Sequence, residues 1–267
     1  MGNTTKKSMT DFNKFGESWP CINPLGYYRS FLLGRNRDKS VIVDLFDDHR
    51  LMFFSILNNR RTKSPLNLVS IDYHLDLAQP SKSEKENLSK LDLESEKEVA
   101  CFVWHHLNPL NDNHILSAAY LNLISDIIIL TKDRDPKCSE YRDKDGNKHN
   151  VHSYNDYNRF IENVELVEDN IFLDIDLDYF VKKSRDSNDN EIIKYVLKEK
   201  DYAIFNKRGR LMRHCKDKLE MVTIAREPEH CGGVLNSNAI LSRICSKLFH
   251  GSIAGGCRPR PCLKIYS

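Results

Sequence analysis

The chain has 267 residues, 40% of them hydrophobic, which is enough to bury the core of one large α/β domain or of two small ones. It contains 40 Lys and Arg residues against 38 Asp and Glu residues, so the formal net charge is only +2. A charge so close to neutral excludes the strong overall field that would draw the chain to nucleic acid or to an anionic membrane. We therefore expect neither as a partner.

The sequence also lacks signals for export or membrane insertion. No apolar stretch approaches the ~20 residues that span a bilayer, and the first residues lack the apolar segment of a signal peptide. The eight cysteines are scattered without a Cys-x-x-Cys pair. These features predict a cytoplasmic protein with mostly free thiols. A zinc site is not expected at His230, Cys231, Cys257 and Cys262, because their spacing matches no compact zinc motif.

The amino-terminal third contains the first candidate metal ligand. Residues 1–39 predict an arm of loop with one short element, and residues 40–46 predict a strand. A buried helix is predicted from Leu51, which places His49 at a turn between strand and helix. The side chain of His49 could face the carboxyl edge of a sheet there, or it could cap the helix beside Asp47 and Asp48. The local sequence leaves both readings open.

The segment Leu68–Asp76 predicts a buried parallel strand that ends in polar groups. Its apolar residues run into Asp72-Tyr73-His74-Leu75-Asp76. Side chains alternate faces along an extended segment, so Asp72, His74 and Asp76 point the same way. Burying three such groups without partners would be costly, and a bound cation removes that cost.

The middle of the chain predicts less specific elements. Residues 81–98 predict an exposed helix with a thin apolar stripe, and residues 100–104 predict a buried element that leads into His105 and His106. Residues 121–130 predict a buried strand, or a helix that ends in a strand. The polar region 131–158 has turn chemistry at residues 143–148, which predicts a surface loop or a hairpin.

A second acidic strand is predicted at residues 170–180, where Asp174, Asp176 and Asp178 again alternate with apolar residues. Neighbouring carboxylates repel one another unless one is protonated or a metal lies between them. The three aspartates also resemble the start of a calcium-binding loop. That loop is not completed, because Tyr179 stands where it needs Gly and Arg185 where it needs a bidentate Glu.

The carboxyl-terminal part predicts a helix at residues 191–205, a strand at 221–225, a loop at 226–233 and a helix at 236–250. Residues 251–267 predict a surface tail. Strands that alternate with helices indicate an α/β fold: one domain over residues 1–267, with a doubly wound, mainly parallel sheet flanked by helices. The core of this domain is expected at about residues 40–250.

The two acidic strands and His49 together provide six candidate metal ligands. One ion does not need six ligands, whereas two ions that share carboxylates do. A set dominated by oxygen, with one or two histidines, suits manganese, magnesium or iron(II) better than structural zinc. The candidate ligands are His49, Asp72, His74, Asp76, Asp174 and Asp176.

These motifs resemble those of the arginase and deacetylase superfamily, in which a His after a strand is followed by Asp-x-His-x-Asp and then by Asp-x-Asp. Four strings are most similar to a divergent arginase-like family that includes peptide arginases. They are Asp-Asp-His-Arg, Ser-Ile-Asp-Tyr-His-Leu-Asp, Leu-Asp-Ile-Asp-Leu-Asp-Tyr-Phe and Thr-Ile-Ala-Arg-Glu-Pro-Glu-His-Cys-Gly. The resemblance covers roughly residues 40–235. It implies a three-layer fold, two Mn²⁺ ions per chain and conversion of arginine side chains in a precursor peptide to ornithine and urea.

The resemblance also implies roles for individual residues. Asp76 or Asp178 would hold the proton of the attacking water, and His105 or His106 would exchange protons with solvent. Glu229, or as second choice Glu227, would accept forked hydrogen bonds from the guanidinium group.

The chain departs from arginases in two places that bear on the substrate. Leu177-Asp178-Tyr179-Phe180 replaces Gly-Leu-Asp-Pro, and the loop that grips the α-groups of free arginine is not recognisable. The second departure suits a peptide substrate, which residues 131–158 and 182–190 and the amino-terminal arm would border. Three alternatives stay open: a hydrolase of a free guanidine such as arginine or agmatine, a deacetylase, and a non-catalytic metal-dependent binding protein.

Overall fold

A computed structural model describes residues 28–33, 40–59, 64–133, 138–185, 191–195, 202–206 and 208–249. Its main feature is an eight-stranded sheet with the strand order β1-β2-β10-β7-β3-β4-β6-β5. The strands are β1 (Tyr28–Leu33), β2 (Ser40–Phe46), β3 (Leu66–Asp72), β4 (Ile124–Thr131), β5 (Cys138–Arg142), β6 (Lys148–Tyr154), β7 (Ile171–Asp176) and β10 (Leu219–Ala225).

The six central strands of this sheet, from β2 to β6, are all parallel, and β1 and β5 pair antiparallel at its two edges. The central strands are rich in Val, Ile and Leu because both of their faces are buried. In β7, for example, Phe172 packs into one hydrophobic cluster and Leu173 into the other.

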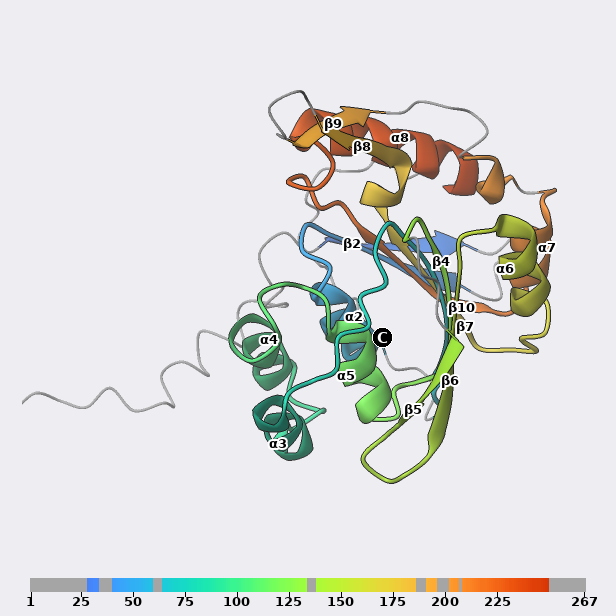
Figure 1. The fold of residues 1–267 in the computed structure, drawn as a ribbon. Coiled ribbons are helices and arrows are strands. Elements are labelled where there is room, and N and C mark those ends of the chain that lie inside the picture. The colour runs from blue at the N-terminus through green and yellow to red at the C-terminus, as the bar shows by residue number, and fades with distance from the viewer. Residues whose placement is uncertain are drawn as a thin grey trace, which may run out of the picture.

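Helices cover both faces of the sheet and make a three-layer α/β/α arrangement (Figure 1). On one face lie α2 (Leu51–Asn58), α3 (Lys82–Lys90), α4 (Glu96–His105) and α5 (His114–Tyr120). On the other face lie α6 (Tyr157–Val164), α7 (Arg210–Cys215) and α8 (Val234–Phe249). The short helices η1 (Leu177–Phe180) and η2 (Ala203–Phe205) and a two-stranded hairpin of β8 (Val181–Arg185) and β9 (Glu191–Tyr195) complete the described elements.

The predicted fold class is confirmed: the sheet is mainly parallel, it is covered on both faces, and it contains both acidic strands. These two strands, β3 and β7, are neighbours in the sheet although about a hundred residues separate them. None of the helices in the described part of the chain is long and apolar enough to cross a membrane.

Several local predictions differ from the structure. The predicted helix at 191–205 is wrong, because residues 191–195 form β9, which pairs with β8, and residues 203–205 form η2. The β-branched pair Ile192 and Ile193 suits a strand, and pairing with β8 decides the outcome. Residues 81–105 form two helices, with Ser81 capping the first and Ser95 the second. The amino-terminal arm before residue 28 and the tail 251–267 lie outside the described residues.

Candidate metal centre

Polar side chains from several elements converge at the carboxyl edge of the sheet, on the face covered by α2 and α5. Asp72 ends β3, and Asp174 and Asp176 are the last aspartates of β7. His49 lies in the turn that leads into α2, and His114 is the first residue of α5. This edge is where open α/β sheets gather ligands, because each crossover connection starts there.

His49 lies at the centre of the cluster and is fully buried. Its Nδ1 atom is 3.2 Å from an oxygen of Asp76, 3.2 Å from an oxygen of Asp176 and 3.7 Å from an oxygen of Asp72. Its Nε2 atom lies on the other side of the ring, 2.9 Å from Oδ2 of Asp174. The ring therefore links Asp174 on one side to three carboxylates on the other.

Asp174 has both carboxylate oxygens engaged within the protein. Thr223 donates its hydroxyl to Oδ1 at 2.5 Å, and Ser70 donates to Oδ2 at 3.1 Å, beside the contact with His49. Asp174 accepts a hydrogen bond from Nε2–H of His49, and when the ring is neutral the lone pair is therefore on Nδ1, which faces the other aspartates. This arrangement is that of a carboxylate that orients a metal-binding histidine.

Asp178 belongs to the cluster as well, although it lies in η1 beyond the end of β7. One of its oxygens accepts from the backbone N–H of Tyr73, and the other is 3.4 Å from Nδ1 of His74. Asp176 caps η1 by accepting from the backbone N–H of Asp178. The side chain of His74 is 49% exposed, so this end of the cluster faces solvent.

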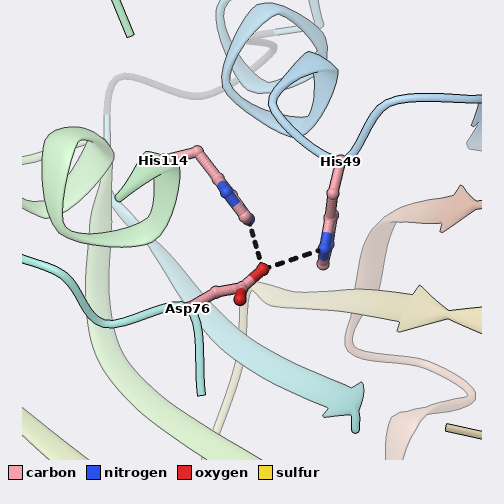
Figure 2. Close-up of side chains that lie close together, drawn as sticks. All are labelled: His49, Asp76 and His114. Carbon is pink, nitrogen blue, oxygen red and sulfur yellow. Dashed lines mark ion pairs between the residues drawn. The ribbon is translucent and has the colours of Figure 1, made fainter. Parts of the chain in front are cut away.

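His114 is a member of the cluster that the sequence analysis did not identify. Figure 2 shows Asp76 between His49 and His114. Nε2 of His114 lies 3.8 Å from the Asp76 oxygen, and its ring centroid is 4.4 Å from that of His49. The available signal was weak: a single His at the start of a short apolar helix, 38 residues after Asp76.

Glu227 forms the opposite wall of the cluster. It follows β10 and has a left-handed backbone with φ of 35°. Its side chain is buried, and Asn111 donates its amide to Oε1. Nε2 of His230 is 4.0 Å from Oε2. Glu227 therefore faces Asp176 and Asp178 from a different loop.

Within the described residues, four overlapping sets of side chains could hold metal ions. The sets are His49–Asp76–His114, His49–Asp72–Asp176, Asp72–His74–Asp178 and Asp176–Asp178–Glu227. Asp72 joins the second set to the third. Four buried atoms of these sets have no hydrogen-bond partner among the described residues: Nδ1 of His49, Oδ2 of Asp72 and both ring nitrogens of His114. Buried lone pairs left in this way fit a bound cation.

The charges of the cluster support the same interpretation. Burial, followed by the charges of Asp76 and Asp176, raises the pKa of Asp72 well above its usual value. Burial and the neighbouring Asp178 raise the pKa of Asp176 to about 7. Burial also favours the protonated form of Asp76, but the neighbouring His49, whose Nδ1 is 3.2 Å away, outweighs burial and lowers the pKa of Asp76. Without a cation the site thus carries more negative charge than it can easily hold.

The two histidines have opposite shifts. Burial disfavours the charged form of His49, yet the charge and hydrogen bond of Asp174 outweigh it and raise the pKa of His49 well above 6.5. Burial and the neighbouring His49 lower the pKa of His114 to about 4. His114 is therefore the neutral member of the pair.

The structure brings together most, but not all, of the residues predicted for the site. His49, Asp72, His74, Asp76, Asp176 and Asp178 converge with Glu227. Asp174 lies on the far side of His49 from these residues and contacts the Nε2 atom of that ring. His105 and His106 are exposed at the end of α4, where His106 contacts Asn87, and Glu229 is exposed. None of these last three is in a set that could hold a metal ion.

Neither a scan against protein-family models nor a search of curated proteins finds a match to this chain.

Proposed function

We propose that the chain is a dinuclear metal hydrolase that converts arginine side chains in a peptide to ornithine and urea. The observation that carries this proposal is the pair of overlapping ligand sets that share Asp72, with buried Glu227 beside them. The resemblance of the motifs to those of peptide arginases supports it. The donors are mainly carboxylate oxygens, and this composition favours Mn²⁺.

The ligands that we propose differ from the sequence prediction by a shift of two residues along β7. His49, Asp72, Asp76 and Asp176 would hold one ion, and Asp72, His74, Asp176 and Asp178 the other. Asp174 would orient His49 through Nε2. When bound, the two ions would lower the pKa of a water molecule so that hydroxide is available near neutral pH.

The residues around the ions have separate tasks in this reaction. Glu227 would accept hydrogen bonds from the planar guanidinium group. Asp76 would hold the proton of the attacking water, and neutral His114, 3.8 Å from it, would exchange that proton with the leaving amine. The water oxygen joins the guanidine carbon, the bond from that carbon to the side-chain nitrogen breaks, and the nitrogen leaves as the amine of ornithine.

A peptide substrate is favoured over free arginine by the absence of a recognisable loop for the α-groups. Exposed apolar side chains in the loop before α5 and at the start of α8 could also be covered by an extended substrate. Leu110 precedes Asn111 and is 77% exposed, and Leu235 follows the Glu227 loop and is 85% exposed. Contacts of this kind would provide binding energy that free arginine cannot use.

The test is mass spectrometry of arginine-containing peptides incubated with manganese-loaded protein, with urea measured in parallel. Each conversion should remove the mass of one cyanamide unit from the peptide. Urea from free arginine or agmatine, with the peptide unchanged, would assign the protein to small guanidines. Release of acetate from an acetylated amine would indicate a deacetylase. Stoichiometric metal without any turnover would indicate a binding protein.

A further inference from the structure

Hydrogen bonds within its own loop hold Asn111 beside Glu227. The loop connects α4 to α5, and in it Asn108 accepts from the backbone N–H of Leu110 and donates to Asp112. The backbone N–H of Asn111 donates to the carbonyl of Asn108 at 3.0 Å. This turn gives Asn111 a left-handed backbone, with φ of 60°, and directs its side chain to Glu227, 116 residues away in sequence.

Left-handed backbones at residues other than glycine are costly, and here they concentrate at the site. Five described residues of this kind have positive φ, and three of them, Asp76, Asn111 and Glu227, lie at the carboxyl edge of the sheet. The other two, Asn122 and Asn170, precede β4 and β7 at the opposite edge. Such conformations persist at functional sites where the surrounding structure fixes them.

With Glu227 ionised, the NH₂ group of Asn111 donates to Oε1 of Glu227, because a carboxylate can accept but not donate. The amide oxygen Oδ1 is then left buried, with no hydrogen-bond partner among the described residues. An ion, a donor or a ligand must satisfy this oxygen.

The carboxylate of Glu227 and the amide oxygen of Asn111 are both acceptors, and they lie beside Asp176 and Asp178, whose carboxylate oxygens are within 4.8 Å of one of Glu227. A ligand that fits such a wall must be cationic and must offer several N–H groups in one plane. A guanidinium group has this geometry, whereas an ammonium group is a compact point charge with donors that are not coplanar.

We propose that Asn111 and Glu227 together form the guanidinium-binding wall, and that Oδ1 of Asn111 accepts from a second terminal nitrogen of the substrate. This inference rests on the proposed function and deepens it, because it names the substrate group that the site recognises. It predicts that both terminal nitrogens must carry hydrogen. An arginine whose one terminal nitrogen bears two methyl groups should therefore bind more than tenfold more weakly.

The experiment measures binding and turnover separately, by calorimetry and by urea release, on manganese-loaded protein. The probes are arginine with its amino and carboxyl groups capped, its asymmetrically dimethylated form, and capped lysine. The variants are Asn111→Ala, Asn111→Gly and the control Asn122→Ala. The control removes an Asn of nearly the same φ, 55°, at the far edge of the sheet, so strain and fold are matched.

We expect Asn111→Ala and Asn111→Gly to weaken binding of capped arginine at least tenfold, with metal content and melting temperature like those of Asn122→Ala. Dimethylation should then weaken binding little further. If the Asn111 variants bind like the control, or if capped lysine binds as well as capped arginine, the inference is wrong even where urea is released. Tight, Asn111-dependent binding without urea would uphold the inference and refute the proposed reaction. Absence of binding and turnover in the unmodified protein would refute both.

Discussion

Replacing Asp174 by Asn tests which role Asp174 has. The sequence predicts that Asp174 is a metal ligand, whereas the structure favours a role in orienting His49. The carboxylate accepts from Nε2–H of His49, which leaves Nδ1 as a lone pair that faces Asp72 and Asp176. An amide nitrogen at the position of Oδ2 would donate to Nε2 instead. The proton of His49 would then move to Nδ1, where it blocks metal binding.

The magnitude follows from the role of Asp174 as an orienting group. Loss of a partner that orients a metal-binding histidine typically costs 10–100-fold in affinity, or about 1.4–2.7 kcal/mol. Asn can also turn its oxygen toward His49 and its NH₂ toward Thr223, whose hydroxyl can accept, so we expect a partial loss. Asp176→Asn, by contrast, should remove at least one ion entirely.

The assay is competition for Mn²⁺ with a fluorescent chelator, together with elemental analysis of the loaded protein. Asp44→Asn is the matched control. Asp44 is equally buried on β2, which is separated from β7 by β10, and it accepts from Ser55 and Asn59 of the α2 region, outside the sets that could hold a metal. Wild-type affinity in Asp174→Asn would refute the orienting role. Loss of a whole ion, as in Asp176→Asn, would show that Asp174 is itself a ligand.

Three further predictions follow from the same cluster. Glu227→Gln should raise KM for a guanidine substrate by about tenfold or more, because it weakens a hydrogen bond to a charged group. Glu229→Gln should leave KM within about twofold. Equal losses in the two variants, measured by steady-state kinetics, would contradict this prediction. His114→Asn should lower kcat at least ~100-fold with metal content unchanged. The double variant with His105→Asn and His106→Asn should keep its kcat. The reverse result would support His105 or His106 as the residue that exchanges protons. Chelation should lower the melting temperature by roughly 5–10 °C, since ions at 100 times their Kd contribute about 2.7 kcal/mol; scanning calorimetry without a shift would count against a structural contribution of the ions.

Much of the fold could be predicted from the sequence, because its strongest signals are local. Runs of Val, Ile and Leu that end in carboxylates identify β3 and β7, since a strand buried on both faces has few other compositions. His49 could be proposed from its place between a strand and a helix. The turn chemistry at residues 143–148 allows a hairpin, and β5 and β6 do pair antiparallel on either side of it. The strands themselves could not be assigned, because β5 is polar and mostly exposed and the pairing of β6 with β4 is a tertiary contact.

The residues that sequence reasoning missed depend on contacts between distant segments. His114 and Asn111 lie in a connection with no repeated pattern, and only the fold brings them to Asp76 and Glu227. The choice between Glu227 and Glu229 turns on the backbone of one residue. The left-handed conformation of Glu227 turns its side chain inward, and two residues later the chain has reached the surface.

The register of the second acidic motif shows where a period-two pattern stops being informative. A rule that counts alternate residues cannot distinguish Asp174, Asp176 and Asp178. The first Asp-x-Asp pair, Asp174 and Asp176, is then the natural choice for the metal ligands. The position of the strand end breaks this equivalence. Asp174 pairs with Thr223 of β10 and Ser70 of β3 inside the sheet, which commits its oxygens to hydroxyl donors and to His49. Asp176 ends β7, and Asp178 lies in the short helix η1 that follows it, so these two carboxylates lie at the edge of the sheet and close to Glu227. The depth of an aspartate in the sheet depends on the strands beside it, and no single segment encodes that depth. It therefore decides which of the three aspartates can bind an ion and which can only orient a ligand.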